Sequence, residues 1–138
     1  MGNTKSLGIA YTDQDISGSS VIESDAVLGY TANAQGTVTQ ATSKSTAVTL
    51  NKSAGRITMN NAALAGNAAV SFTLNNTYLS ANDVLVLCAS AGSVADATTY
   101  TAYVNTLGTG TASITLRNLT ATSQSEAVVL NFAIIHCA

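Results

Sequence analysis

Short β-like stretches alternate with turn-like segments along most of this chain, and this spacing constrains the fold more than any other feature. Val, Ile and Thr, which favour extended backbone, are frequent in these stretches, while Gly, Asn and Ser gather between them. Eight strands are predicted, near residues 36–41, 46–51, 55–61, 68–76, 83–90, 98–107, 111–120 and 126–137. Such regular spacing without a helical pattern is typical of an all-β sandwich or barrel.

Eight strands fit a jelly roll, in which two Greek keys of four strands each protect the sheet edges. We therefore expect an all-β fold: an eight-stranded jelly-roll-like β-sandwich with an extended N-terminal arm. An immunoglobulin-like sandwich is the alternative, although the Cys…Trp…Cys signature of that fold is absent.

Alternation of apolar and polar residues predicts which side chains face the core. The residues expected to face inward are Val70, Phe72, Leu74, Ile114 and Leu116. The residues expected to face water are Ser71, Thr73, Asn75, Ser113, Thr115 and Arg117. Residues 83–89 and 127–135 are almost continuously apolar, which predicts two strands covered on both faces.

The Thr- and Ser-rich stretch from residue 34 to residue 59 could be a linker, an adhesive tract or a set of strands with exposed hydroxyls. We predict three short strands with their turns. The residues expected to point inward are Val38, Val48, Leu50, Ile57 and Met59. Regularly spaced Thr can also bind ice or sugars, but the sequence has neither the repeat nor the clustered aromatic residues of such surfaces.

Large side chains are scarce in the 138 residues, which include no Trp, two Phe and five Tyr. A chain of this length forms one compact domain. A core built from Ala and Val buries little apolar area per residue, so we expect stability to depend partly on a partner or on oligomerisation.

Charge and hydropathy argue against two classes of partner. The net charge is −2 and the five basic residues are scattered, so no patch can neutralise the phosphates of a nucleic acid. No apolar run approaches the ~20 residues of a membrane-spanning helix, and no signal peptide is evident. We expect synthesis in a cytoplasm. In that reducing compartment Cys88 and Cys137 are expected to be small buried hydrophobes, with a disulfide between them left open.

Composition changes near residue 35. Residues 1–35 carry four of the seven acids, many Gly and Ser, and only short apolar pieces. We predict an arm over residues 1–35, which contacts a partner or a neighbouring subunit, and a β-sandwich body over residues 36–138. The candidate contact residues in the arm are Tyr11, Asp13, Asp15 and Tyr30.

Candidate catalytic residues are few. His136 is the only histidine and has no nucleophile motif, so we interpret it as a partly exposed residue at a strand end. Zinc binding by Cys88, His136 and Cys137 is disfavoured because adjacent residues of a strand point to opposite faces. The acids outside the arm lie at predicted strand ends or turns, not as a pair in a groove. They are Asp83, Asp96 and Glu126.

Two glycine-containing stretches resemble ligand-binding loops. Residues 13–24 begin like a calcium loop, but Ser24 stands where that loop needs a bidentate Glu, so a solvated acidic turn is preferred. Residues 107–113 join two predicted strands and open no helix, which indicates a hairpin turn instead of a phosphate loop. We predict no catalytic residue, no metal and no cofactor.

The amino-acid sequence of the body resembles that of a known protein family. The block from residue 36 to residue 65, "GTVTQATSKSTAVTLNKSAGRITMNNAALA", is followed by "VSFTLNN", "ITLRNLT" and "SEAVVLNFAII". This order resembles a β-rich domain of virion proteins of tailed bacteriophages, found in small capsid decoration (cement or head-fibre) proteins and in longer fibre proteins.

The resemblance implies a non-enzymatic structural protein, typically a homotrimer, on the outer capsid surface of the virion. Its partners would be the major capsid protein and its own copies, after synthesis in the cytoplasm of a host bacterium. The alternative is a tail-fibre or head-fibre domain that binds a host receptor or glycan. A glycan hydrolase is a third possibility, for which the sequence lacks the paired carboxylates.

Overall fold

The computed structural model describes residues 25–90 and 99–137. Those residues form a short 3-10 helix, η1 (Ala32–Ala34), and eight strands. The strands are β1 (Gln35–Thr39), β2 (Val48–Thr49), β3 (Ala54–Thr58), β4 (Ala69–Asn75), β5 (Val84–Ser90), β6 (Tyr100–Gly108), β7 (Thr111–Asn118) and β8 (Val129–Ile135). Each predicted strand corresponds to one of these eight, and the two described ranges contain no α-helix.

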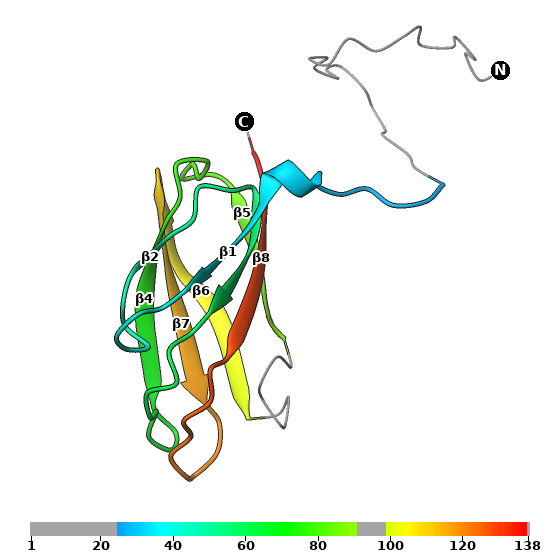
Figure 1. Ribbon diagram of the computed structural model, residues 1–138. Helices are drawn as coiled ribbons and strands as arrows, with labels where there is room; N and C mark the ends of the chain where they lie inside the picture. Colours follow the sequence, from blue (N-terminus) through cyan, green and yellow to red (C-terminus); the bar gives the residue numbers. More distant parts are fainter. Residues whose placement is uncertain (1–24, 91–98, 138) are drawn as a thin grey trace, which may run out of the picture.

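The strands form two four-stranded sheets that pack face to face (Figure 1). The first sheet has the order β1-β3-β8-β5 and the second has the order β2-β4-β7-β6. The chain alternates between the sheets from β1 to β6, and β6 and β7 then pair as a hairpin within the second sheet. The prediction of an all-β sandwich is therefore confirmed.

The jelly-roll winding is not confirmed. β1 pairs with β3 in parallel, and β2 pairs with β4 in parallel, whereas a jelly roll is antiparallel throughout. The physical reason is the connectivity: after β1 the chain crosses to the other sheet for β2, and it returns beside β1 in the original direction. Such crossovers allow parallel neighbours that a hairpin cannot provide.

The core between the sheets consists mainly of Leu, Ile and Phe. Its fully buried members include Ile57, Leu74, Ile114, Leu116 and Leu130. The prediction of an Ala and Val core is wrong, because alanine contributes only Ala112 to the buried apolar residues of the described part. The core therefore gives no independent reason to expect oligomerisation.

Most of the predicted inward positions are confirmed. Val48, Ile57, Met59, Phe72, Leu74, Ile114 and Leu116 are buried, and Val38, Leu50 and Val70 are partly buried against the core. The prediction for Thr115 is wrong, because this residue is buried. Its strand lies between β4 and β6, and its hydroxyl is 2.8 Å from that of Ser71 across the pair. Flanking strands thus cover a central position that alternation alone assigns to water.

The turn between β6 and β7 is the predicted hairpin. Gly108 pairs with Thr111, so two residues, Thr109 and Gly110, form the loop. Gly110 has a φ of 77°, a left-handed backbone conformation that glycine adopts without steric strain. The two glycines of this stretch therefore serve the chain reversal.

Candidate functional site

The N-terminal segment joins the body at Tyr30. The Tyr30 hydroxyl donates a hydrogen bond to the carbonyl of Ile134, near the end of β8. The Gln35 side-chain amide donates to the Tyr30 carbonyl at 3.0 Å. These two bonds hold the segment against the body where β8 ends and β1 begins, and we call this place the arm joint.

Two hollows of about 280 Å³ each border the arm joint. The first is lined by Tyr30, Ser53, Tyr78, Ile134 and His136. The second is lined by Thr31, Asn33, Ala34, Lys52, Ser53 and Tyr78. The Lys52 ammonium donates to the Asn33 carbonyl at 2.8 Å, so this cation helps to hold the joint.

Beyond the joint, residues 25–29 run away from the body as the blue segment of Figure 1. Val27 is 89% exposed and Leu28 is 84% exposed. Two adjacent apolar side chains in an extended exposed segment are typical of an arm that binds another surface.

An apolar strip lies on the outer face of the first sheet, near the arm joint. We define it as Val84, Val86, Ala133 and Ile135, where Val84 pairs with Ile135 and Val86 pairs with Ala133. Val84, Val86 and Ile135 are 51%, 48% and 55% exposed. The prediction that both faces of β5 and β8 are covered is therefore wrong for the described part of one chain, in which no element covers this end of the sheet.

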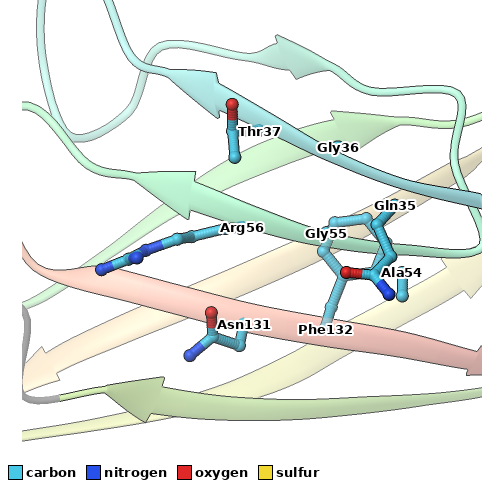
Figure 2. A pocket seen from close by; sticks show the side chains of 8 residues that line it. All are labelled: Gln35, Gly36, Thr37, Ala54, Gly55, Arg56, Asn131 and Phe132. Carbon is cyan, nitrogen blue, oxygen red and sulfur yellow. The ribbon is translucent and has the colours of Figure 1, made fainter. Parts of the chain in front are cut away.

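A polar depression of about 550 Å³ lies on the same sheet (Figure 2). It is lined by Gln35, Gly36, Thr37, Ala54, Gly55, Arg56, Asn131 and Phe132. Gly36 and Gly55 pair across β1 and β3 and add no side chains to it. The Phe132 ring packs beneath Gly55, since a Cβ on that glycine would lie 2.7 Å from the ring. The side chains of the depression that can form hydrogen bonds are Gln35, Thr37, Arg56 and Asn131.

Arg56 is the cation of this depression. It is exposed, and its guanidinium has neither a hydrogen bond nor an ion pair within the described residues. Arg56 pairs with Asn131, and the next outward row of the sheet contains Ala54, Ala133 and Val86. The polar depression and the apolar strip therefore form one continuous surface.

The two cysteines are free and exposed, so the prediction that they are buried hydrophobes is wrong. Cys88 follows Leu87, which packs against the core. Alternation along β5 therefore places Cys88 on the outer face of the first sheet. Cys137 follows the end of β8. The apolar residues near the two cysteines in the sequence lie either on the core side of the sheet, as Leu87 does, or in the apolar strip, as Ile135 does.

His136 and Asp83 form an ion pair at the arm-joint end of the sandwich when the histidine is protonated. The His136 Nδ1 atom is 2.7 Å from Asp83 Oδ1, with the Asp83 side chain fully buried and that of His136 64% exposed. Ser80 donates to the carboxylate from its backbone N–H and from its hydroxyl, each at 2.8 Å. The Ser80 backbone hydrogen bond is the largest cause that lowers the pKa of Asp83, to about 2, although burial acts in the opposite direction.

This cluster is not a Ser-His-Asp triad. In a triad the serine hydroxyl binds the histidine, whereas here the Ser80 hydroxyl binds Asp83. The Cys137 backbone N–H also donates to Asp83, at 3.2 Å. The cluster ties the end of β8 to the start of β5, and the prediction of an exposed strand-end histidine is confirmed.

Replacing Asp83 with asparagine is expected to remove an acid-sensitive contribution to stability. Because the folded-state pKa is below the unfolded value, the carboxylate stabilises the fold above about pH 4, and this effect is lost as the pH falls toward about 2. The variant should have a lower Tm than the wild type at pH 6 and a smaller fall in Tm between about pH 4 and pH 2. Asn82→Ala, at the exposed position beside Asp83, is the control. Equal acid sensitivity of wild type and Asp83→Asn would contradict the assignment.

A second polar cluster is buried at the opposite end of the sandwich. The Lys44 ammonium donates to the carbonyls of Asn60 and Glu126 at 2.5 and 2.6 Å. Burial lowers the pKa of Lys44, while the charge of Glu126 acts against this shift. The Tyr100 hydroxyl donates to the Glu126 carboxylate, and burial together with this bond raises the pKa of Tyr100. Because these donors are satisfied by neighbouring loops, the cluster joins loops and offers no free acid or base.

The described part of the chain has neither a metal-binding cluster nor a membrane-spanning helix. Within residues 25–90 and 99–137, no group of three or more His, Cys, Asp or Glu side chains is placed to hold a metal ion. No helix in these ranges is long and apolar enough to cross a membrane. The calcium-loop resemblance of residues 13–24 lies outside the described residues.

Comparisons with protein-family models, with curated proteins and with solved structures found no match to this chain. The candidate site is therefore defined by its geometry: an arm joint, an exposed apolar arm segment, and a sheet face that carries the apolar strip and the polar depression.

Of the predicted arm residues, the structure places Tyr30 at the arm joint. Tyr11, Asp13 and Asp15 lie outside the described residues. Sequence reasoning did not find Arg56 or the exposed half of β5, although one signal was present. A strand that is apolar on both faces indicates a second covering surface, which can belong to another chain.

Proposed function

We propose that this chain is a non-enzymatic structural protein of a tailed-bacteriophage virion. In this proposal it is a capsid decoration (cement) protein that binds and stabilises the outer surface of the head as a homo-oligomer, a trimer. Its partners are the major capsid protein and its own copies. It is made in the host bacterial cytoplasm and then resides on the virion.

One observation carries the proposal: a compact sandwich combines an extended apolar arm with an exposed apolar sheet face. Both Val27 and Leu28 in the arm, and Val84 and Val86 on the sheet, expose apolar surface in the single chain. Exposed apolar surfaces of this kind mark sites of association with other proteins. The resemblance of the body to decoration proteins supports the same assignment.

Labelling intact virions with an antibody against the body tests the location. Label spread over the head, with a copy number that matches a capsid lattice, supports decoration, and label confined to the tail contradicts it. A chain without residues 1–29, which retains Tyr30 and all eight strands, should keep its circular-dichroism spectrum and lose binding to undecorated capsids. Normal binding by this shortened chain would show that the arm does not attach the protein.

The polar depression favours a second candidate function, the head-fibre or tail-fibre domain that binds a receptor or glycan. Arg56, Asn131 and Thr37 offer hydrogen-bonding groups of the kind that bind sugar hydroxyls. Glycan-array binding that is lost in Arg56→Ala, together with a tail location, would support this function over decoration.

A further inference from the structure

We propose that residues 25–28 of one copy dock on the outer face of the first sheet of a second copy. Val27 binds the apolar strip, and Asp25 binds Arg56 in the polar depression. The proposal depends on the homo-oligomer in the proposed function but not on its capsid location.

Two apolar surfaces of one chain are exposed in its described part. Val27 and Leu28 are almost fully exposed, and Val84, Val86 and Ile135 are half exposed. β5 is also the edge strand of the first sheet, where its unpaired backbone groups and apolar side chains form a template for another chain. Joining these surfaces removes both from water.

The residue pattern of β5 and β8 indicates that the outer face of these strands is covered by another surface. Both strands carry apolar residues on successive positions, a pattern found where both faces of a sheet are covered. In the described residues of one chain only the inner face is covered, by the core. The arm of a second copy supplies the missing cover, because its apolar side chains are exposed in the described part of their own chain.

The arm and the body carry net charges of opposite sign. Residues 1–35 contain four acids and one lysine, whereas residues 36–138 contain four basic and three acidic residues. Of the basic residues in the body, Lys44 is buried and Lys52 is bound to the arm joint. Arg56 is exposed and unpaired among the described residues on the face in question, so an acidic arm is attracted to this face.

The separation of Asp25 and Val27 along the chain matches the separation of neighbouring outward rows on the sheet. Asp25 precedes Val27 by two residues, and two residues of extended chain span about 6.6 Å. Successive outward rows of a sheet are also two residues apart, and the row of Arg56 and Asn131 adjoins the row of Ala133 and Val86. Asp25 and Ala26 form a bend in the single chain. Once this bend straightens and the segment lies along the strands, its acid reaches the first row and its valine the second.

The arm joint directs this segment away from its own sheet. The Tyr30 hydroxyl is bound to the Ile134 carbonyl, and the Tyr30 carbonyl accepts from Gln35. From that point the chain leaves the body in Figure 1, so in this conformation the segment does not cover the outer face of its own first sheet.

Solution mass of the full chain provides the first test, by sedimentation over a range of concentrations. The wild type should form an oligomer, and Val27→Asp or Val86→Asp should each raise its dissociation constant about tenfold or more. Leu119→Asp is the matched control, because Leu119 is also 48% exposed but lies beyond the end of β7 in the second sheet. The arm variant cannot disturb the core, so its loss of association is independent of folding.

Charge exchange provides the second test. Asp25→Arg and Arg56→Asp should each weaken the oligomer, and the double variant should recover most of the wild-type affinity. Arg117→Asp, on the exposed face of the second sheet, should have no effect. Failure of the double variant to recover would contradict the pairing of Asp25 with Arg56.

Cross-linking provides the third test and identifies which chain is contacted. In a Cys137→Ser background, Val27→Cys should react with the native Cys88 through a short bis-maleimide. A mixture of ordinary and 15N-labelled chains should then give mixed-label cross-linked peptides. Cross-links confined to one chain would show that the arm folds back, and their absence from an oligomer that Val27→Asp leaves intact would overturn the docking while the oligomer stands. A wild-type monomer would overturn both the docking and the proposed homo-oligomer.

Discussion

Lys44→Ala is expected to lower the free energy of unfolding by about 3–5 kcal/mol. The lysine side chain is 3% exposed, and its ammonium is the hydrogen-bond donor to the carbonyls of Asn60 and Glu126. Alanine leaves both carbonyls without this donor and leaves a cavity where the aliphatic stem packed. Urea unfolding followed by circular dichroism measures the change.

Lys44→Met separates the two causes, because methionine keeps most of the stem and removes the charge. We expect a loss of about 1–2 kcal/mol, smaller than for alanine, since the cost of burying the ammonium is also removed. Burial lowers the folded-state pKa of Lys44, so the unfolded chain binds the proton more strongly. Wild-type stability should therefore gain a contribution as the pH rises toward 10.5, and Lys44→Met should lack it. Equal losses for alanine and methionine would show that the stem contributes little.

Asn118→Ala is expected to lower the free energy of unfolding by about 2–4 kcal/mol. The fully buried Asn118 side chain lies at the end of β7, and its Nδ2 atom is 3.0, 3.1 and 2.8 Å from the carbonyls of Leu64, Ala65 and Thr122. Its Oδ1 atom accepts hydrogen bonds from the backbone N–H and the hydroxyl of Thr120. One side chain thus joins the loop before β4 to the loop after β7.

Asn118→Asp tests the donor half of this network, because an ionised carboxylate has no proton to donate to the three carbonyls. It should be nearly as damaging as alanine, although the Thr120 bonds can still form. Asn61→Ala is the control, since Asn61 is an exposed loop residue whose side chain has no hydrogen-bond partner among the described residues. Denaturant midpoints of the four chains give the comparison, and a shift for Asn61→Ala equal to that for Asn118→Ala would contradict the role of the network.

The two clusters explain how loops rich in Ala, Ser and Thr hold fixed shapes. Gln40 donates to the carbonyls of Lys44 and Thr46 at 3.0 and 2.8 Å and accepts from the Asn60 N–H at 3.1 Å. No buried side-chain nitrogen or oxygen in the described ranges lacks a hydrogen-bond partner. These hydrogen bonds therefore hold the loop between β1 and β2 against the loop after β3.

The candidate site could be predicted only in part. Tyr30 is recognisable as the last aromatic residue before the body, and the structure places it at the arm joint. Arg56 has the pattern of any outward residue on an alternating strand, so the sequence cannot distinguish it from a solvated side chain. Strand pairing sets its surroundings, because it places Arg56 between Thr37 of β1 and Asn131 of β8 in the polar depression.

The sequence by itself determined the number of strands, their order along the chain and most of the core. These properties follow from local alternation and turn residues, and Phe72, Leu74, Ile114 and Leu116 all lie where the alternation places them. The tertiary structure decided which strands are neighbours, including the two parallel pairs, because pairing depends on contacts between residues far apart in the chain. It also decided that the outer face of β5 is open: an apolar strand requires cover on both faces, but its sequence does not specify which chain provides that cover.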